Sequence, residues 1–302
     1  MIGNQLSFEA RGSVYQGAAL ILVSELFLVG SGMAIKQIGD QLPVEMIVFF
    51  RNLLGVALLL PWLFKNGLPA IRTNRIHLHF MRAGVGVVAM GCLFYTWGHL
   101  PLAQAALLKQ TAPFFMPILA FFWLGERVGW LVKLSILIGF SGVYLILNPQ
   151  EGAFNWVVMV ALCGAFLGAL AKVTVRNLRS TEPAQRIVFY FALFSALIAL
   201  VPAVIGWQPL TWPLFGLLIV VAACSTLAQL LLSKAYGMAP AGQLGPFTYG
   251  SVAFAVFLGW LIWDEQLTTY MWAGICLVCG AGLVAMLGKA TPAGVPKSQT
   301  ES

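Results

Sequence analysis

Three ionisable side chains lie inside apolar segments of this sequence: Glu25, Arg51 and Lys109. Arg51 follows Pro43 by eight residues, and Lys109 follows Pro101 by eight. At ~1.5 Å of rise per helical residue, both would lie roughly 12 Å along their helices, and Glu25 roughly 15 Å from the end of its own. Charged groups at such depth usually face the protein interior or a water-filled cavity. Two cations and a carboxylate would share one layer, where they could hold a zwitterion or an organic anion.

The charged layer has two interpretations. A structural ion pair between Glu25 and either Arg51 or Lys109 would orient three helices and leave one cation over. A substrate or coupling-ion site would use all three charges. Glu25 is then the candidate proton carrier, because desolvation disfavours the charged form of a carboxyl group. The second interpretation is preferred, and the partner of Glu25 is left open.

Polar and aromatic side chains follow at matching places in the two halves of the sequence. Gln110 stands next to Lys109, and Thr248 and Tyr249 belong to "GPFTYGS". This glycine- and proline-containing stretch is expected to interrupt a helix and to expose backbone groups that need partners. The predicted substrate-binding or coupling residues are therefore Glu25, Arg51, Lys109, Gln110, Thr248 and Tyr249.

Two prolines, Pro113 and Pro117, follow Lys109 within the same apolar segment. Proline removes a backbone donor and clashes with the preceding helical turn. We therefore expect these two residues to bend the helix that carries Lys109.

The elements that position these residues must lie in a lipid bilayer. Of the 302 residues, 60% are hydrophobic and 9% are charged, whereas soluble domains carry about 25% charged residues. This excludes an ordinary water-soluble protein. The net charge of +7 comes from too few residues to form a nucleic-acid-binding face. The five cysteines lie in apolar runs without a metal-ligand pattern, so no metal or other cofactor is expected.

Ten segments are long and apolar enough to cross a bilayer, since a span needs about 20 residues. Seventeen residues are Lys or Arg, and most of them, Arg82 included, fall on the side of the N-terminus. This asymmetry predicts that both termini are cytoplasmic. Lys36 and Lys172, near segment ends, are expected to snorkel to an interface. The ten predicted spans are 14–35, 43–64, 77–98, 101–124, 129–147, 154–176, 183–205, 211–236, 240–263 and 268–288.

The sequence also repeats itself. "PVEMIVFF" begins at Pro43 and "PAQRIVFY" begins at Pro183, and the same offset of 139 or 140 residues aligns Glu126 with Glu265. Because each half holds five spans, the second half would enter the membrane from the opposite side. The fold prediction is an all-α membrane protein of ten transmembrane helices in two inverted five-helix repeats. The repeats cover 1–149 and 150–288, and 289–302 form a disordered cytoplasmic tail.

Two segments, "LPLAQAALLKQTAPFFMPILAFFWLGERV" and "MAPAGQLGPFTYGSVAFAVFLGWLIWDEQL", resemble the EamA family of the drug/metabolite transporter superfamily. The resemblance covers nearly the whole chain. It departs in the second half, where Val252 and Val256 stand in place of the two prolines and Asp264 replaces a glycine. The resemblance implies a transporter but does not indicate its substrate.

We therefore expect a secondary transporter in the cytoplasmic (inner) membrane that moves a small organic metabolite by alternating access. An amino acid or a related zwitterion or anion is the leading substrate, export is the leading direction, and proton coupling is one option. The alternatives are import of an anionic metabolite and export of a cationic drug. Two alternatives belong to other functional classes: an intramembrane enzyme that uses Ser141, and a structural membrane protein without transport activity. The expected partners are the lipid bilayer and the substrate, not nucleic acid; the oligomeric state stays open.

Overall fold

The computed structural model describes the backbone of residues 2–112, 114–115, 119, 130–147, 156–179, 181–235, 237–238, 247–248 and 250–287. Side chains are described from Tyr15 onward within these ranges, except at 132, 143, 146–147, 176, 282 and 285–287. Within these ranges the regular structure is entirely helical. The predicted all-α fold class is therefore confirmed for the described part of the chain.

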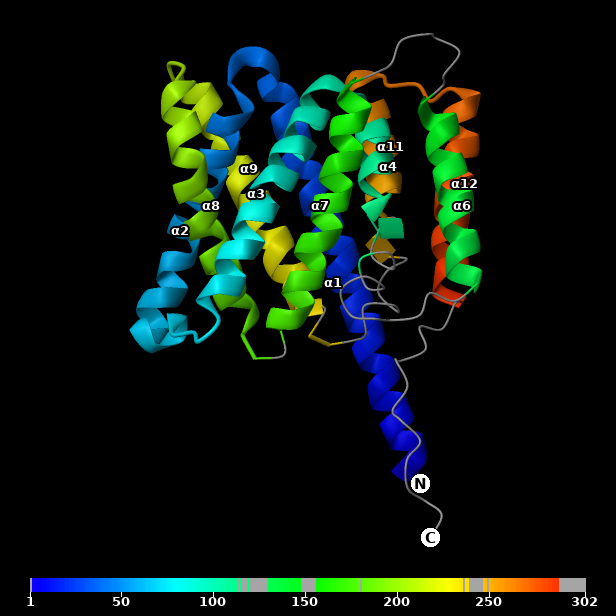
Figure 1. Cartoon of the computed structure of the whole chain (residues 1–302), viewed down its shortest axis with the longest axis horizontal. Coiled ribbons are helices and arrows are strands. Elements are labelled where there is room, and N and C mark those ends of the chain that lie inside the picture. Colours follow the sequence, from blue (N-terminus) through cyan, green and yellow to red (C-terminus); the bar gives the residue numbers. More distant parts are fainter. Residues whose placement is uncertain are drawn as a thin grey trace.

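Ten α-helices run through the described residues and pack side by side as a bundle (Figure 1). Short 3₁₀ turns at Gly39–Gln41 and Leu68–Ile71 flank α2. The helices are α1 (Ile2–Ile38), α2 (Val44–Asn66), α3 (Ile76–His99), α4 (Leu102–Lys109), α6 (Trp130–Leu147), α7 (Trp156–Leu178), α8 (Ala184–Ile205), α9 (Trp212–Ala235), α11 (Gly250–Trp263) and α12 (Thr269–Leu287).

Six of these helices are long and apolar enough to cross a membrane, namely α1, α2, α3, α7, α8 and α9. Three shorter apolar stretches lie at Lys133–Gly142, Gly250–Trp263 and Thr269–Ala281. The predicted spans at 101–124 and 240–263 fall partly outside the described residues. The number of ten spans and their inverted repetition therefore stay predictions.

Both copies of the repeated octapeptide begin a helix, as expected. Pro43 and Pro183 are the N-caps of α2 and α8, with nearly the same extended backbone (φ −60°, ψ 146° and φ −68°, ψ 153°). Proline is tolerated at a helix start because the first amide groups have no intrahelical acceptor. The two helices also pack against each other.

Helix α4 is shorter than the predicted span around it. It ends at Lys109, and Gln110 follows as its C-cap. A proline at position 113 offers no amide N–H to the Lys109 carbonyl four residues earlier. Lys109 is therefore on the last turn of a helix rather than in the middle of one.

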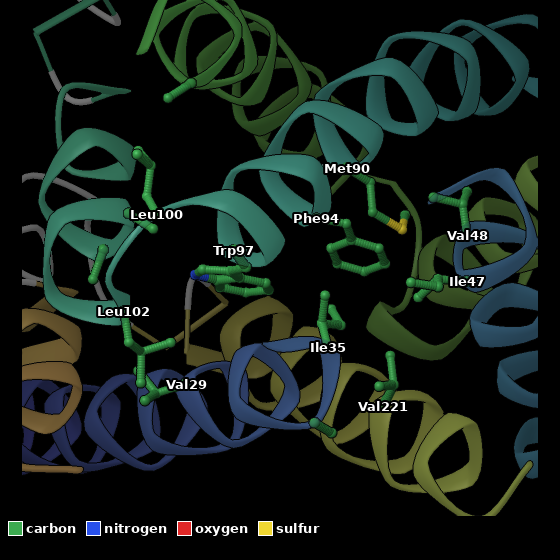
Figure 2. Packing of buried hydrophobic residues seen from close by; sticks show 14 of the residues in the cluster. Val29, Ile35, Ile47, Val48, Met90, Phe94, Trp97, Leu100, Leu102 and Val221 are labelled. Carbon is green, nitrogen blue, oxygen red and sulfur yellow. The ribbon is translucent and has the colours of Figure 1, made fainter. Parts of the chain in front are cut away.

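The main core joins helices from both ends of the sequence. Figure 2 shows Ile35 of α1 beside Phe94 and Val221, with Trp97 a short distance along α3. The Phe94 and Trp97 rings stack with their centroids 5.9 Å apart. Gly32 lets Trp97 approach α1 closely, since a Cβ there would lie 2.9 Å from the indole. This packing fixes α1 against α3, the helices that carry two of the charged residues described next.

Candidate functional site

Helices α1, α2, α3, α4, α7, α8 and α9 surround a cavity of about 170 Å³. A single water needs only ~10–15 Å³ on the same measure, so the cavity could hold a small organic molecule. Its walls include Met90 and Phe94 together with five ionisable side chains: Glu25, Arg51, Arg82, Lys109 and Lys172. The structure thus brings the three predicted charges together, and it adds two cations that were placed elsewhere.

Glu25 pairs with Lys109. The Lys109 ammonium donates a 2.5 Å hydrogen bond to Oε2 of Glu25, and the Glu25 side chain is 2% exposed. The pair joins α1 to the end of α4. Of the two partners considered for Glu25, the structure selects Lys109.

Arg51 has no carboxylate partner among the described residues. Its NH1 donates a 2.5 Å hydrogen bond to the Asn52 amide oxygen, while Nε meets no acceptor. The residue is 2% exposed. A buried cation without a counter-charge is costly, so Arg51 carries charge that the described protein groups do not neutralise.

Arg82 is a second buried arginine of the same kind. It was counted among the cytoplasmic loops and helix ends, and the structure shows it six residues into α3, where it is 4% exposed and lines the cavity. Its NH2 donates to Gln229 at 3.3 Å, and Nε and NH1 have no partner. The positive-inside count does not separate an arginine six residues into a helix from one in a loop.

The Phe191 ring holds both guanidinium groups. The guanidinium carbon of Arg82 lies 3.9 Å from the ring centroid, and that of Arg51 lies 5.4 Å from it. Cations favour the face of an aromatic ring. The ring itself fits against α3 at Gly86, where a Cβ would lie 2.6 Å from Phe191 Cε2. Phe191 is therefore the element that brings two like charges to one wall of the cavity.

Lys172 also lines the cavity, so the expectation that it snorkels to an interface was wrong. Its ammonium interacts electrostatically with both Lys109 and Glu25. Position 172 lies six residues before the end of α7, and no residue type nearby distinguishes it from a lysine at the membrane surface. Helix packing, absent from the local sequence, decides its place.

Gln110 and Thr248 meet each other. The Gln110 amide donates to the Thr248 backbone oxygen at 2.5 Å and to the Ser251 hydroxyl at 2.6 Å. This satisfies a carbonyl in the interrupted stretch before α11, where a partner was expected. Neither Gln110 nor Thr248 is among the residues lining the cavity. The predicted site residues Tyr249, Pro113 and Pro117 lie outside the described residues.

Lys36 was expected to snorkel to an interface, but in the structure it has a partner within the protein. Its ammonium pairs with Glu265 and lies 5.1 Å from the centroid of the Trp263 ring. Glu265 also accepts the Leu102 backbone N–H at 2.9 Å, at the start of α4. One carboxylate thus ties together the ends of α1, α4 and α11.

A second polar network lies at the end of the bundle where α3 begins. Glu182 accepts hydrogen bonds from Thr73 Oγ1 and Arg186 NH1, both at 2.6 Å. Burial alone would raise the pKa of Glu182, but these hydrogen bonds and the Arg186 charge hold it below its ordinary value. Tyr190 donates to the Ile71 carbonyl at 2.6 Å. The connection between α2 and α3 is thereby fixed to the start of α8.

The described residues contain no group of three or more His, Cys, Asp or Glu side chains able to hold a metal ion. The chemistry of the cavity is that of cationic donors, one paired carboxylate and an apolar wall. An apolar cavity with a few converging polar groups is the usual form of a ligand site, so this cavity is the candidate substrate site.

Comparison with known proteins agrees with a transporter. The family model described as "EamA-like transporter family" matches residues 15–148 and again 155–287. The chain is 30% identical over 250 residues to a pseudopaline exporter of Pseudomonas aeruginosa, covering 81% of this chain and 86% of the relative. It is 28% identical over 251 residues to a riboflavin transporter of Brucella anthropi, covering 81% and 88%.

A solved crystal structure shares the fold, with a TM-score of 0.63 at 17% sequence identity; the match covers 92% of this chain and 97% of that one. The two relatives are bacterial small-molecule transporters, and six helices of this chain are long and apolar enough to cross a membrane. The chain is therefore a member of the EamA-like transporter family, in the drug/metabolite transporter superfamily, and a multi-pass protein of the inner membrane.

Proposed function

We propose that this protein is a secondary transporter that moves a small organic anion or zwitterion by alternating access. The cavity carries this proposal: its lining comes from both halves of the sequence and includes four cations against one carboxylate. An amino acid or a related metabolite has the size and the charged groups that such a site can hold. The same excess of positive charge disfavours the alternative of a cationic drug.

Two observations support the inverted repeats that alternating access would use. The family model matches two consecutive segments of similar length. In addition, α2 packs on α8, α4 on α11, and α6 on α12, and each pair joins corresponding helices of the two halves. The contacts of α1 with α9 and of α3 with α7 would exchange under the same pseudo-symmetry. The proposed repeats remain 1–149 and 150–288.

We place both termini in the cytoplasm. Arg72, Arg75, Arg179 and Arg186 all lie near the end of the bundle where α2 ends and α3 begins. The positive-inside rule assigns this end to the cytoplasm. We favour export as the direction of net transport, as in the pseudopaline exporter that the chain resembles, with import as the alternative.

Glu25 is the proposed coupling residue. A proton on Glu25 would remove the negative charge that now pairs with Lys109, and the released ammonium could then take the anionic group of a substrate. The Glu25 carboxylate and the anionic group of the substrate would thus compete for one cation, and a proton on Glu25 would favour the substrate. This gives a physical link between a pH gradient and substrate movement.

Flux through the purified full chain in proteoliposomes tests the proposal. The panel contains amino acids, dicarboxylates, nucleotides and organic cations, each with and without a pH gradient. We expect uptake of at least one anionic or zwitterionic solute above protein-free liposomes. If no member of the panel moves in either direction, the transporter proposal fails.

The intramembrane-enzyme alternative depends on Ser141. This hydroxyl lies on an exposed face of α6 and donates to the Leu137 carbonyl of its own helix at 3.0 Å. That contact supports a structural serine rather than a nucleophile. If the chain were an intramembrane enzyme, Ser141→Ala should abolish its activity; we expect the variant to leave transport flux unchanged.

A further inference from the structure

The two buried arginines of the cavity present hydrogen-bond donors that the described protein groups leave unused. Arg51 Nε, Arg82 Nε and Arg82 NH1 are buried and without an acceptor. The neighbouring acceptors are neutral amides, Asn52 and Gln229. Asparagine and glutamine can orient a guanidinium group, but they do not neutralise its charge. The site therefore has fixed geometry and unbalanced charge.

The Phe191 ring brings the two arginine side chains close to each other. Both guanidinium groups approach the same ring, and the Arg51 charge acts on Arg82. Like charges held together in a buried site repel each other. An oxyanion placed between or beside them would relieve this repulsion and accept the unused donors. Guanidinium groups bind carboxylates with short, charge-assisted hydrogen bonds.

The cavity has a second positive group around Lys172. Its neighbours are the Lys109–Glu25 pair, which is internally neutral. Lys172 is therefore an additional cation beyond the pair. A ligand with one acidic group would balance part of the excess charge, whereas a ligand with two would balance more of it and could reach both groups of cations.

We propose that the substrate carries at least two acidic groups, one bound by Arg51 and Arg82 beside Phe191 and the other by Lys172 next to Lys109. This inference rests on the proposal that the cavity is the transport site. It narrows the substrate class from small organic anions or zwitterions to organic molecules with two or more carboxylates. Gln229 positions Arg82, and the apolar wall contacts the carbon chain between the acidic groups.

Binding to the full chain in detergent micelles tests this, with glutarate as the dicarboxylate probe and butyrate as the monocarboxylate control. We expect glutarate to bind at least tenfold more tightly than butyrate by isothermal titration calorimetry at constant chloride. Arg51→Gln and Arg82→Gln should each weaken glutarate binding about tenfold or more. Arg82→Lys keeps the charge but loses the forked donor, so its affinity for glutarate should lie between those of the parent and Arg82→Gln.

Lys234→Gln provides the matched control, because Lys234 is an exposed cation at the end of α9; glutarate binding should not change. A melting temperature and a monodisperse elution profile for each variant separate loss of binding from loss of fold. Since Arg82 is a buried charge without a counter-charge, Arg82→Gln should melt no lower than the parent without ligand. Equal affinity for glutarate and butyrate, or glutarate binding unaffected by both arginine variants, overturns the proposal.

Different experimental results would contradict the two-acid inference and the proposed transport function. Flux of a neutral or monoanionic solute that persists in Arg51→Gln and Arg82→Gln would sink the two-acid inference and leave the transporter intact. Absence of any flux would remove the transporter proposal, while arginine-dependent glutarate binding would still identify the anion site.

Discussion

Lys109, on the last turn of α4, donates a hydrogen bond of 2.5 Å to Glu25 in the middle of α1. The contact crosses 84 positions of the sequence and lies in the wall of the cavity. Breaking a buried pair by removing one partner is strongly destabilising, because the other charge is left unpaired. The pair can therefore serve both to join two helices and to respond to a proton.

Replacing Glu25 with Gln should lower stability and abolish the effect of a pH gradient on flux. Loss of one partner of a buried pair costs about 3–5 kcal/mol. Double replacement, Glu25→Gln with Lys109→Met, should recover most of that stability, because no unpaired charge remains. Thermal unfolding of the parent and these two variants measures the first effect, and proteoliposome flux with and without a pH gradient measures the second. Undiminished proton dependence in Glu25→Gln would contradict the coupling role.

Adding one methyl group at Gly86 should disturb the arginine wall. A Cβ there would lie 2.6 Å from Phe191 Cε2, so the ring must move, and both guanidinium groups contact that ring. Gly86→Ala should cost about 1–3 kcal/mol, as overpacking does, and should weaken anion binding. Gly84→Ala is the matched control on the same helix, since nothing lies within 4 Å of its Cβ.

Rescue distinguishes this positioning effect from general damage to α3. Phe191→Leu combined with Gly86→Ala should restore the melting temperature by removing the overlapping ring atoms. It should not restore anion binding, because the aromatic face that holds the guanidinium groups is gone. Equal behaviour of Gly86→Ala and Gly84→Ala would show that Phe191 is not a positioning element.

Helix starts and buried charges could be predicted from the sequence more reliably than the side chains that these charges contact. Pro43 and Pro183 mark helix starts because proline chemistry is local, and both are found as N-caps. The buried charges Glu25, Arg51 and Lys109 could be located because an ionisable residue deep in an apolar segment is costly wherever the helix packs. These predictions needed no knowledge of neighbouring helices.

Arg82 and Lys172 could not be assigned in the same way. Each lies six residues from the end of its helix, where a basic side chain can either reach the membrane surface or turn inward. Which one occurs depends on the contact of α3 with α7 and on the Phe191 ring from α8. A register argument does offer one signal: Arg82, Gly86 and Met90 follow at four-residue intervals and face the same cavity. Lys36 likewise needed a partner 229 positions away, Glu265.

The Glu182 network should make stability depend on pH in the acidic range. Hydrogen bonds from Thr73 and Arg186 hold the pKa of Glu182 below its ordinary value. The charged form is thus stabilised in the folded state, and its contribution is present above the ordinary glutamate pKa of about 4.3. It is lost as pH falls through the lower pKa of the folded protein.

Glu182→Gln tests this by removing the titrating group while keeping the shape of the side chain. At pH 7 the variant should be less stable by on the order of 1–2 kcal/mol, because hydrogen bonds to a charged carboxylate are lost. The difference in melting temperature from the parent should shrink between pH 6 and pH 3. A difference that stays constant over this range would show that the Glu182 charge contributes nothing to stability.

Two cysteines offer a direct test of whether α3 and α7 must move during transport. The Cys92 and Cys163 thiols lie one on each of these two packed helices and interact electrostatically, and both are free. Oxidation by a membrane-permeant copper–phenanthroline complex should join them, with two electrons passing to the oxidant and two protons released. If α3 and α7 belong to different moving halves, the disulfide should reduce flux at least tenfold, and dithiothreitol should restore it. Cys163→Ser should be insensitive to the oxidant, whereas a cross-linked protein with full activity would show that these helices move as one unit.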